Sequence, residues 1–420
     1  MRSVKQWLLI CLLIEIFCVT YVLKFVSLVP MATILYTLCG IAISFFILYV
    51  PEKKLSVTLL ANRSQATGCY QLLMWLFGGL VMYIFTKQWI IQSPLSYSDA
   101  DMIPIMQVMS QRFLEGHWSM VYQPVQEIWN GIQPIYLPAM WMPFLVSVKF
   151  GFDPRWITSF GVFLSFSIFI LLWRTHWQKI SGAVLLFAAG ILCLWLYTDA
   201  THNFIRLSEE GIVVFYYSLL VLALLSENFL LVGIAAAFCA LSRYAIAGWL
   251  PAVTIYLLLI RKQKKDTIQF FLSFATVILL LVILPFGLEP IRIAVQQPEQ
   301  YMQHATRIWK EAPEYFTQSM GFAKFFGPEQ VTLQHEMLLV LSFLAPLLFM
   351  LVIKYKNRHM NRYNNIALAA LKLSIVVVYT FIDVPYQYLF YTSSFISLIA
   401  IAGVSGKEEN AEGIHMSQRQ

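Results

Sequence analysis

Long apolar segments, each followed by a shorter polar one, recur along almost all of the 420 residues of the chain. A segment of about 17–25 apolar residues is long enough to cross a bilayer as an α-helix. By this criterion we find roughly twelve, near residues 7–28, 31–50, 70–91, 156–173, 181–198, 211–226, 229–243, 245–260, 267–288, 335–353, 365–384 and 388–404. The pattern predicts an all-α, polytopic membrane protein with about twelve transmembrane helices.

One polar interruption, residues 97–118, has the periodicity of a helix that lies on a membrane surface. Its apolar residues recur at the i, i+3, i+4 spacing of one helical face, namely Met102, Ile105, Met109 and Phe113. Polar residues occupy the opposite side. Because Asp99 and Asp101 precede this pattern, we expect an amphipathic helix with two carboxylates at its N-terminus.

Two long polar loops, 92–155 and 289–334, interrupt the predicted spans, and we expect each to carry an amphipathic helix on the outer face. Residues 135–150 are apolar but few, and they contain two prolines, so we expect a re-entrant or surface-lying segment. The predicted regions are an N-terminal transmembrane hairpin with a cytoplasmic linker (1–69), a central transmembrane module (70–260), a C-terminal transmembrane region (261–406) and a cytoplasmic tail (407–420).

Composition and charge support the same class. The chain is 59% apolar and 12% charged, with a mean hydropathy of +0.68, which excludes an ordinary soluble domain. Its net charge of +7 comes from Lys and Arg in short loops that share one side when the spans are threaded alternately. The positive-inside rule assigns that side to the cytoplasm. The charge therefore indicates topology, with a bacterial inner membrane as the best fit, and does not indicate nucleic-acid binding.

The stretch after the third predicted span resembles a known pattern. An acidic residue, Asp101, is followed by a surface helix that ends at Gly116, then by His117-Trp118 and by Gln133-Pro-Ile-Tyr-Leu-Pro138. This order resembles the GT-C superfamily of integral-membrane glycosyltransferases, and within it the bacterial polyprenyl-phosphate-mannose-dependent mannosyltransferases. The chain departs from related families, because it has no Asp-Glu pair at the acidic site and has Gln133 where those families often place Lys.

The resemblance implies a GT-C-like fold in which the module 70–260 is catalytic. It implies transfer of a hexose, with mannose as the first candidate, from a polyprenyl-phosphate-linked donor to a glycan, lipid or protein acceptor on the outer face. Attack by a sugar hydroxyl on the anomeric carbon needs a carboxylate that takes the proton, and a single displacement inverts that carbon. We expect Asp101 to be this base, with Asp99 as a second catalytic candidate. The alternative role for Asp101 is to cap its helix.

The departing phosphate needs positive charge beside it. The candidates that we expect to bind it are Arg243, Arg206, His304 and Arg307. An arginine at a helix end can instead extend its side chain to the lipid headgroups. Glu209 and Glu210 form a second acidic element of the kind that the superfamily often has, or else they begin a helix that starts at Gly211.

Further residues of the first loop, namely His117, Tyr122, Gln133 and Tyr136, are expected to line the substrate site. His117 and His202 lack the spacing of a zinc site. No cofactor follows from the sequence, which leaves open a need for a divalent metal.

Three other functions stay open. A transporter or flippase for a lipid-linked sugar would need charged or broken helices near the middle of the membrane and an inverted repeat. A glycan polymerase or ligase would share the topology predicted here. A non-catalytic assembly subunit would not depend on Asp99 and Asp101. Two charges within predicted spans, Glu15 and Lys372, are expected to pair between helices for structural reasons.

Overall fold

The computed structural model describes residues 2–51, 65–128, 131–173, 180–199, 204–360 and 365–405. In these residues the chain is helical throughout, and the only extended pairing is an isolated bridge between Val125 and Ile132. The prediction of an all-α protein is confirmed.

Eight helices of the described residues are long and apolar enough to cross a membrane. They are formed by α1 (Arg2–Thr20) with the turn that follows it, α2 (Val29–Ile47), α4 (Gln65–Gln92), α8 (Arg155–Trp173), α9 (Ile180–Thr198), α13 (Trp249–Ile255) with its π-helical extension (Tyr256–Arg261), α14 (Lys264–Ile278) with its continuation through α15 (Leu284–Phe286), and α19 (Val331–Met360). The prediction of a polytopic membrane protein is confirmed at this level.

Four shorter apolar helices coincide with the remaining predicted spans: α11 (Glu210–Ser226), α12 (Phe229–Ala240), α20 (Ile366–Phe381) and α21 (Leu389–Ser405). Helix α12 has 12 residues, which at about 1.5 Å per residue is shorter than the hydrocarbon core of a bilayer. The total of twelve crossings therefore stays a prediction.

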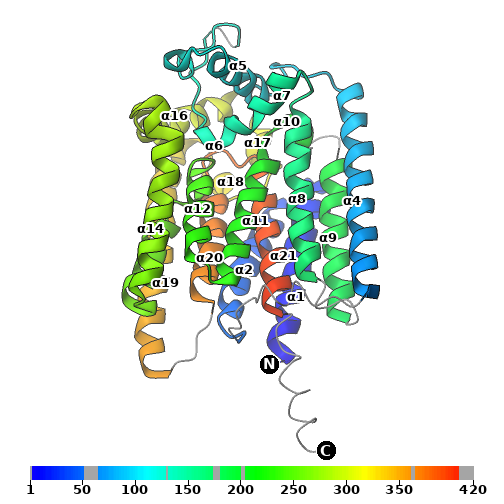
Figure 1. The fold of residues 1–420 in the computed structure, drawn as a ribbon, viewed down its shortest axis with the longest axis vertical. Helices are drawn as coiled ribbons and strands as arrows, with labels where there is room; N and C mark the ends of the chain where they lie inside the picture. The colour runs from blue at the N-terminus through cyan, green and yellow to red at the C-terminus, as the bar shows by residue number, and fades with distance from the viewer. Residues whose placement is uncertain are drawn as a thin grey trace, which may run out of the picture.

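Two of the shorter helices, α11 and α21, lie in the middle of the bundle. Every residue of α21 is buried, and α11 packs against α8, α12 and α21. Helix α4 lies at one edge of the bundle (Figure 1), where none of its predicted crossing window is buried by the protein. Apolar side chains on such an edge are suited to lipid, whereas α21, which has no charged residue, is suited to the centre.

A layer of short helices covers one end of the bundle. It contains α5 (Met102–Leu114), α6 (Pro138–Trp141), α7 (Leu145–Phe150) and α10 (Phe204–Leu207) from the first half of the chain, and α16 (Glu289–Glu311), α17 (Glu314–Thr317) and α18 (Ala323–Phe326) from the second. Figure 1 shows α5, α7 and α16 at the end opposite the start of α1. Residues 135–150 form only short helices in this layer, as predicted for a segment that does not cross.

The predicted amphipathic helix is confirmed in α5, which buries Ile105, Met106 and Met109 and exposes Gln111. The second long loop is held down by a small apolar cluster of its own, made of Ala305, Phe316, Ala323, Val331 and Val384. The rings of Trp309 and Phe316 stack beside it with centroids 4.0 Å apart. This cluster attaches the loop to the turn between α20 and α21.

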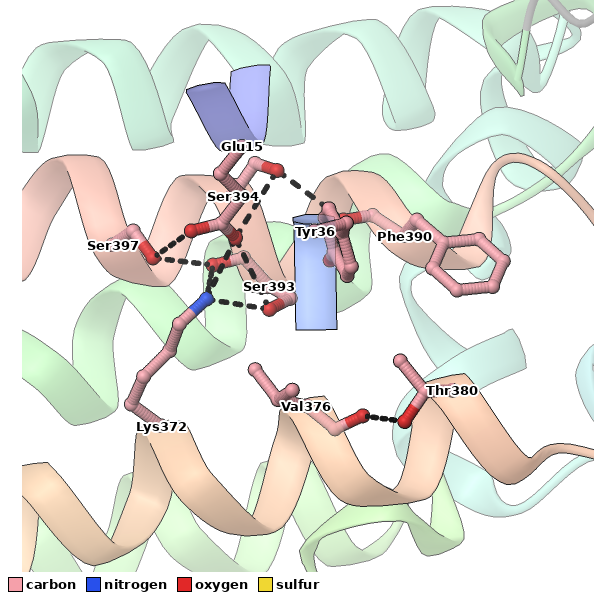
Figure 2. Close-up of polar contacts among 9 residues, drawn as sticks. All are labelled: Glu15, Tyr36, Lys372, Val376, Thr380, Phe390, Ser393, Ser394 and Ser397. Carbon is pink, nitrogen blue, oxygen red and sulfur yellow. Dashed lines mark hydrogen bonds and ion pairs between the residues drawn. The ribbon is translucent and has the colours of Figure 1, made fainter. Parts of the chain in front are cut away.

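A buried ion pair joins the N-terminal hairpin to the C-terminal helices (Figure 2). Lys372 Nζ lies 2.6 Å from Glu15 Oε1, and both side chains are fully buried. Lys372 also donates to Ser393 Oγ at 2.7 Å, and Ser397 Oγ donates to Glu15 Oε2 at 2.8 Å. The predicted pairing of Glu15 with Lys372 is confirmed, and it connects α1, α20 and α21.

We expect Glu15→Leu and Lys372→Met, made separately, to lower the free energy of unfolding by roughly 3–5 kcal/mol each, because each leaves an unpaired buried charge. The double variant should recover most of the loss, since Ser394 and Ser397 can still donate to backbone carbonyls of their own helix. Thermal unfolding in detergent micelles measures all three variants. Losses that simply add in the double variant would contradict a direct pairing.

Candidate functional site

The start of α11 is fixed by a close crossing with α8. Gly161 and Gly211 face each other there, and a Cβ atom on Gly211 would overlap the carbonyl oxygen of Thr158. Thr158 Oγ1 donates to the carbonyl of Ser208 at 3.0 Å, and Ser208 Oγ accepts from the backbone N–H of Glu210 at 3.2 Å. This crossing sets Glu209 and Glu210 at the end of the bundle that the short helices cover.

Arg243 joins these two carboxylates. Its Nη2 lies 2.7 Å from Glu209 Oε1 and 2.8 Å from Glu210 Oε2, and its Nε donates to Glu210 Oε2 at 3.2 Å. Glu210 Oε1 accepts a further hydrogen bond from Thr392 Oγ1 at 2.7 Å. We call Glu209, Glu210 and Arg243 the acidic cluster. It connects α11 with α21 and with the residues that follow α12.

The acidic cluster holds two carboxylates and one guanidinium. Both carboxylates are fully buried, whereas 21% of the Arg243 side chain is exposed. Burial raises the pKa of Glu209 above its ordinary value; Arg243 opposes this shift, and the charges of Glu210 and Asp101 add to it. Glu209 Oε2 is buried and has no hydrogen-bond partner among the described residues. The cluster thus holds one more carboxylate than guanidinium, and one carboxylate oxygen is buried without a partner among the described residues.

Asp101 lies beside this cluster. It occupies the N-cap position of α5, yet its side chain makes no capping hydrogen bond, so the predicted alternative role is not the one observed. The residue is half-buried. Its charge contributes to the pKa shifts of Glu209 and of two buried tyrosines, Tyr136 and Tyr386. Acidic residues from two separate parts of the sequence therefore act on one another here.

Tyrosines surround the same place. Burial is the main cause that raises the pKa of Tyr136, and Asp101 and Glu209 raise it further while Arg243 lowers it. The rings of Tyr386 and Tyr388 stack with centroids 5.7 Å apart. Tyr388 Oη donates to Met102 Sδ, 3.4 Å away at the start of α5. The sequence predicted Tyr136 in the site but not Tyr386 or Tyr388. The one sequence signal for these two tyrosines was their repetition in a polar turn.

His304 and Arg307 reach the site from α16. Arg307 Nη2 donates to His304 Nδ1 at 3.0 Å, and His304 Nε2 lies 3.2 Å from Tyr386 Oη. An arginine can only donate, so Nδ1 must accept, and the imidazole is neutral with its hydrogen on Nε2. Burial lowers the pKa of His304, and the charge of Arg307 lowers it further, which agrees with a neutral ring.

Other predicted residues lie in different surroundings. Asp99 is exposed, and it lines a small cavity together with Arg206. His117 is 58% exposed at the far end of α5, beside Glu115. Gln133 Nε2 donates to the backbone carbonyl of Tyr122. These contacts do not join His117, Tyr122 or Gln133 to the acidic cluster.

The sequence left open a need for a divalent metal. Among the residues that the structure describes, no group of three or more His, Cys, Asp or Glu side chains could hold a metal ion. His202, which was compared with His117 as a zinc ligand, lies outside the described residues.

We expect Arg243→Ala to lower the free energy of unfolding by roughly 3–5 kcal/mol, because it leaves two buried carboxylates without their counterion. Arg292→Ala is the control: Arg292 forms a 3.8 Å pair with Glu289 in which both side chains are at least half exposed, and such pairs contribute little. Thermal unfolding in micelles compares the two variants. If both variants lowered the free energy of unfolding by the same small amount, Arg243 would not be the counterion of two buried carboxylates.

His304 gives a pH dependence of stability. Its pKa in the folded protein is below the ordinary value of 6.5, so its stabilising contribution is present above that value and is lost as the pH falls through the folded pKa. We expect His304→Gln, which keeps a donor for Tyr386 and an acceptor for Arg307, to flatten the fall in Tm between neutral and acidic pH. Tm is measured against pH for the wild-type protein and for His304→Gln. If the two curves were parallel, His304 would not be the group that causes the fall.

Comparison of the chain with protein-family models, with curated protein sequences and with solved structures found no match. The likeness of residues 101–138 to glycosyltransferases therefore stays an expectation from the sequence. Any function must be argued from the acidic cluster, Asp101 and the tyrosines around them.

Proposed function

We propose that this chain is an integral-membrane glycosyltransferase that moves a hexose from a polyprenyl-phosphate-linked donor to a hydroxyl of a glycan, lipid or protein acceptor. The proposal rests on the pairing of Arg243 with Glu209 and Glu210 and on the charge of Asp101, which acts on Glu209, Tyr136 and Tyr386. An acidic site edged by aromatic rings suits a sugar, which offers hydroxyl donors and apolar ring faces.

Asp101 acts as the general base. It is half-buried, so a substrate hydroxyl can reach it, and its charge acts on Glu209 at the covered end of the bundle. The acceptor oxygen attacks the anomeric carbon as Asp101 takes its proton, and the phosphate departs from the opposite face. The negative charge of the acidic cluster stabilises the positive charge that develops on the sugar ring in the transition state.

Arg243 holds Glu209 and Glu210 in place, and these two carboxylates neutralise its charge. Its Nη1 makes no hydrogen bond within the described residues and remains a donor for a phosphate oxygen. Arg307, beside His304 on α16, adds positive charge at the edge of the site. The amphipathic helices α5 and α16 would lie at the outer surface of a bacterial inner membrane, where the prenyl tail of the donor can stay in the lipid.

A transporter or flippase for a lipid-linked sugar is the second candidate. It is favoured by the ion pair between Glu15 and Lys372 inside the bundle, since charged residues within membrane spans often mark transport paths. Flipping would not need Asp101, so the two functions separate in one reconstituted preparation. A polymerase or ligase of lipid-linked glycans would use the same base and differs only in its acceptor.

The test is transfer of labelled hexose from decaprenyl-phosphate-hexose in proteoliposomes. We expect Asp101→Asn to lower kcat by roughly 10²–10⁴-fold, the usual contribution of a general base, with an unchanged Tm. Glu115→Gln is the matched control, because it neutralises an exposed carboxylate at the other end of α5. A folded Asp101→Asn protein with full turnover would refute Asp101 as the base. Wild-type protein that flips the lipid-linked sugar but transfers no hexose would refute the transferase and favour the transporter.

A further inference from the structure

The small cavity that Asp99 and Arg206 line has no role in the reaction described above. It lies between the segment that follows α4, the turn before α5 and the end of α10. Asp99 and Arg206 are its charged residues, Ser96 is among its polar ones, and Leu95 and Leu207 give it apolar walls. It is open to solvent and has room for about one water-sized group.

Two of the segments that line the cavity continue directly into the proposed site. Ala100 lines the cavity and is followed by Asp101, the proposed base. Leu207 lines it from α10 and is followed, one residue later, by Glu209 of the acidic cluster. The Cα atoms of Asp99 and Asp101 are at most about 7 Å apart, since the chain spans at most about 3.6 Å per residue. One small molecule can therefore contact both carboxylates.

One wall of the cavity is fixed by a buried arginine. Arg155, the first residue of α8, is 1% exposed and donates from Nη1 to the carbonyl of Ser93 at 2.5 Å. Its Nε and Nη2 donate to the two carboxylate oxygens of Asp153 at 2.9 and 2.6 Å. A bidentate pair of this kind sets the orientation of the guanidinium. The chain that follows α4 is therefore held against the start of α8.

The turn that carries Asp99 is held by its own hydrogen bonds. The backbone N–H groups of Asp99 and Ala100 both donate to the carbonyl of Ser96 at 3.2 Å. Ser96 Oγ accepts from the backbone N–H of Ser98 at 3.2 Å and lies 2.7 Å from Ser98 Oγ. The Asp99 carboxylate itself is exposed and makes no hydrogen bond or ion pair with any described residue. It is thus positioned by the backbone and available to a ligand.

The two charges of the cavity favour a neutral ligand group that both donates and accepts. An ionised carboxylate such as Asp99 only accepts hydrogen bonds, and the guanidinium of Arg206 only donates them. A hydroxyl does both. An anionic group would be repelled by Asp99, and an ammonium group would be repelled by Arg206. Because the cavity has room for about one water-sized group, the group that fits it is a single hydroxyl.

We propose that this cavity binds a second hydroxyl of the acceptor, on the same sugar as the hydroxyl that Asp101 deprotonates. A serine or threonine side chain has one hydroxyl and cannot occupy both positions. The acceptor is therefore a carbohydrate, and Asp99 binds it without taking part in proton transfer. This inference rests on the proposed function, and it narrows the acceptor of that reaction from a glycan, lipid or protein to a sugar.

Binding of free sugars tests the cavity without any turnover. Saturation-transfer NMR measures the binding of the methyl glycosides of mannose, glucose and galactose to the protein in nanodiscs. We expect at least one of them to bind the wild-type protein, and Asp99→Asn to weaken that binding by roughly tenfold, as the loss of one hydrogen bond to a charged group does. Glu115→Gln, which neutralises another exposed carboxylate, should bind as the wild type does. Binding of none of the three, or equal binding by Asp99→Asn, would overturn the assignment.

The kinetics of transfer separate binding from catalysis at Asp99. With the octyl glycoside of the bound hexose as acceptor, we expect Asp99→Asn to raise the acceptor KM by roughly tenfold and to leave kcat unchanged, because the lost contact is equally strong in the ground state and the transition state. One mono-deoxy form of this acceptor should show the same rise in KM with the wild-type protein and no further rise with Asp99→Asn. A fall in kcat without a rise in KM, or losses that multiply for every deoxy form, would contradict the proposal.

The two proposals fail separately. If a methyl hexoside binds through Asp99 while the wild-type protein transfers labelled hexose to no acceptor, the proposed function is wrong and the sugar-binding cavity stands. If the wild-type protein transfers hexose to a serine-containing peptide or to diacylglycerol, which has one hydroxyl, and not to the octyl hexosides, the transferase stands and the role of the cavity is wrong.

Discussion

The ion pair of Arg243 with Glu209 and Glu210 is the interaction on which the covered end of the bundle depends. Two carboxylates without solvent contact are tolerable there only because one guanidinium reaches both. These contacts hold the start of α11 against the turn before α13. Thr392 of α21 adds a hydrogen bond to Glu210. Asp101 and the tyrosines then assemble around a charge arrangement that is already fixed.

Local patterns in the sequence predicted much of this architecture. The spacing of Met102, Ile105 and Met109 predicted α5, because an amphipathic helix needs no partner to be recognised. The apolar segments predicted the membrane class. The predicted lengths were less accurate: residues 229–243 were predicted as one span, and only Phe229–Ala240 form α12.

Contacts between distant residues could be predicted only when few partners were available. Glu15 and Lys372 were the obvious charges within spans, so their pairing could be expected. Asp99 and Arg206 stand far apart among many polar residues near helix ends, and nothing local indicates that they line one cavity. The same limit applies to Tyr386 and Tyr388, whose closeness to Asp101 arises from the packing of α5 on the turn between α20 and α21.

The covered end of the bundle contains two kinds of charged region. One has excess carboxylate, with Asp101 beside the acidic cluster, and suits a centre that becomes positive. The other has single cationic side chains, and Lys324 belongs to it: its Nζ donates to the carbonyl of Ser319 and to Thr33 Oγ1, and burial lowers its pKa to about 7. A reaction that moves negative charge from a sugar carbon to a phosphate fits such a division.

The shortness of α12 has a consequence for the bilayer itself. Twelve helical residues rise about 18 Å, against a hydrocarbon thickness of roughly 30 Å, and Arg243 follows three residues after the helix ends. Lipid that meets this flank would be drawn thinner by hydrophobic mismatch. Headgroups and water would then dip toward the guanidinium, and an amphiphile would travel a shorter vertical distance to reach it.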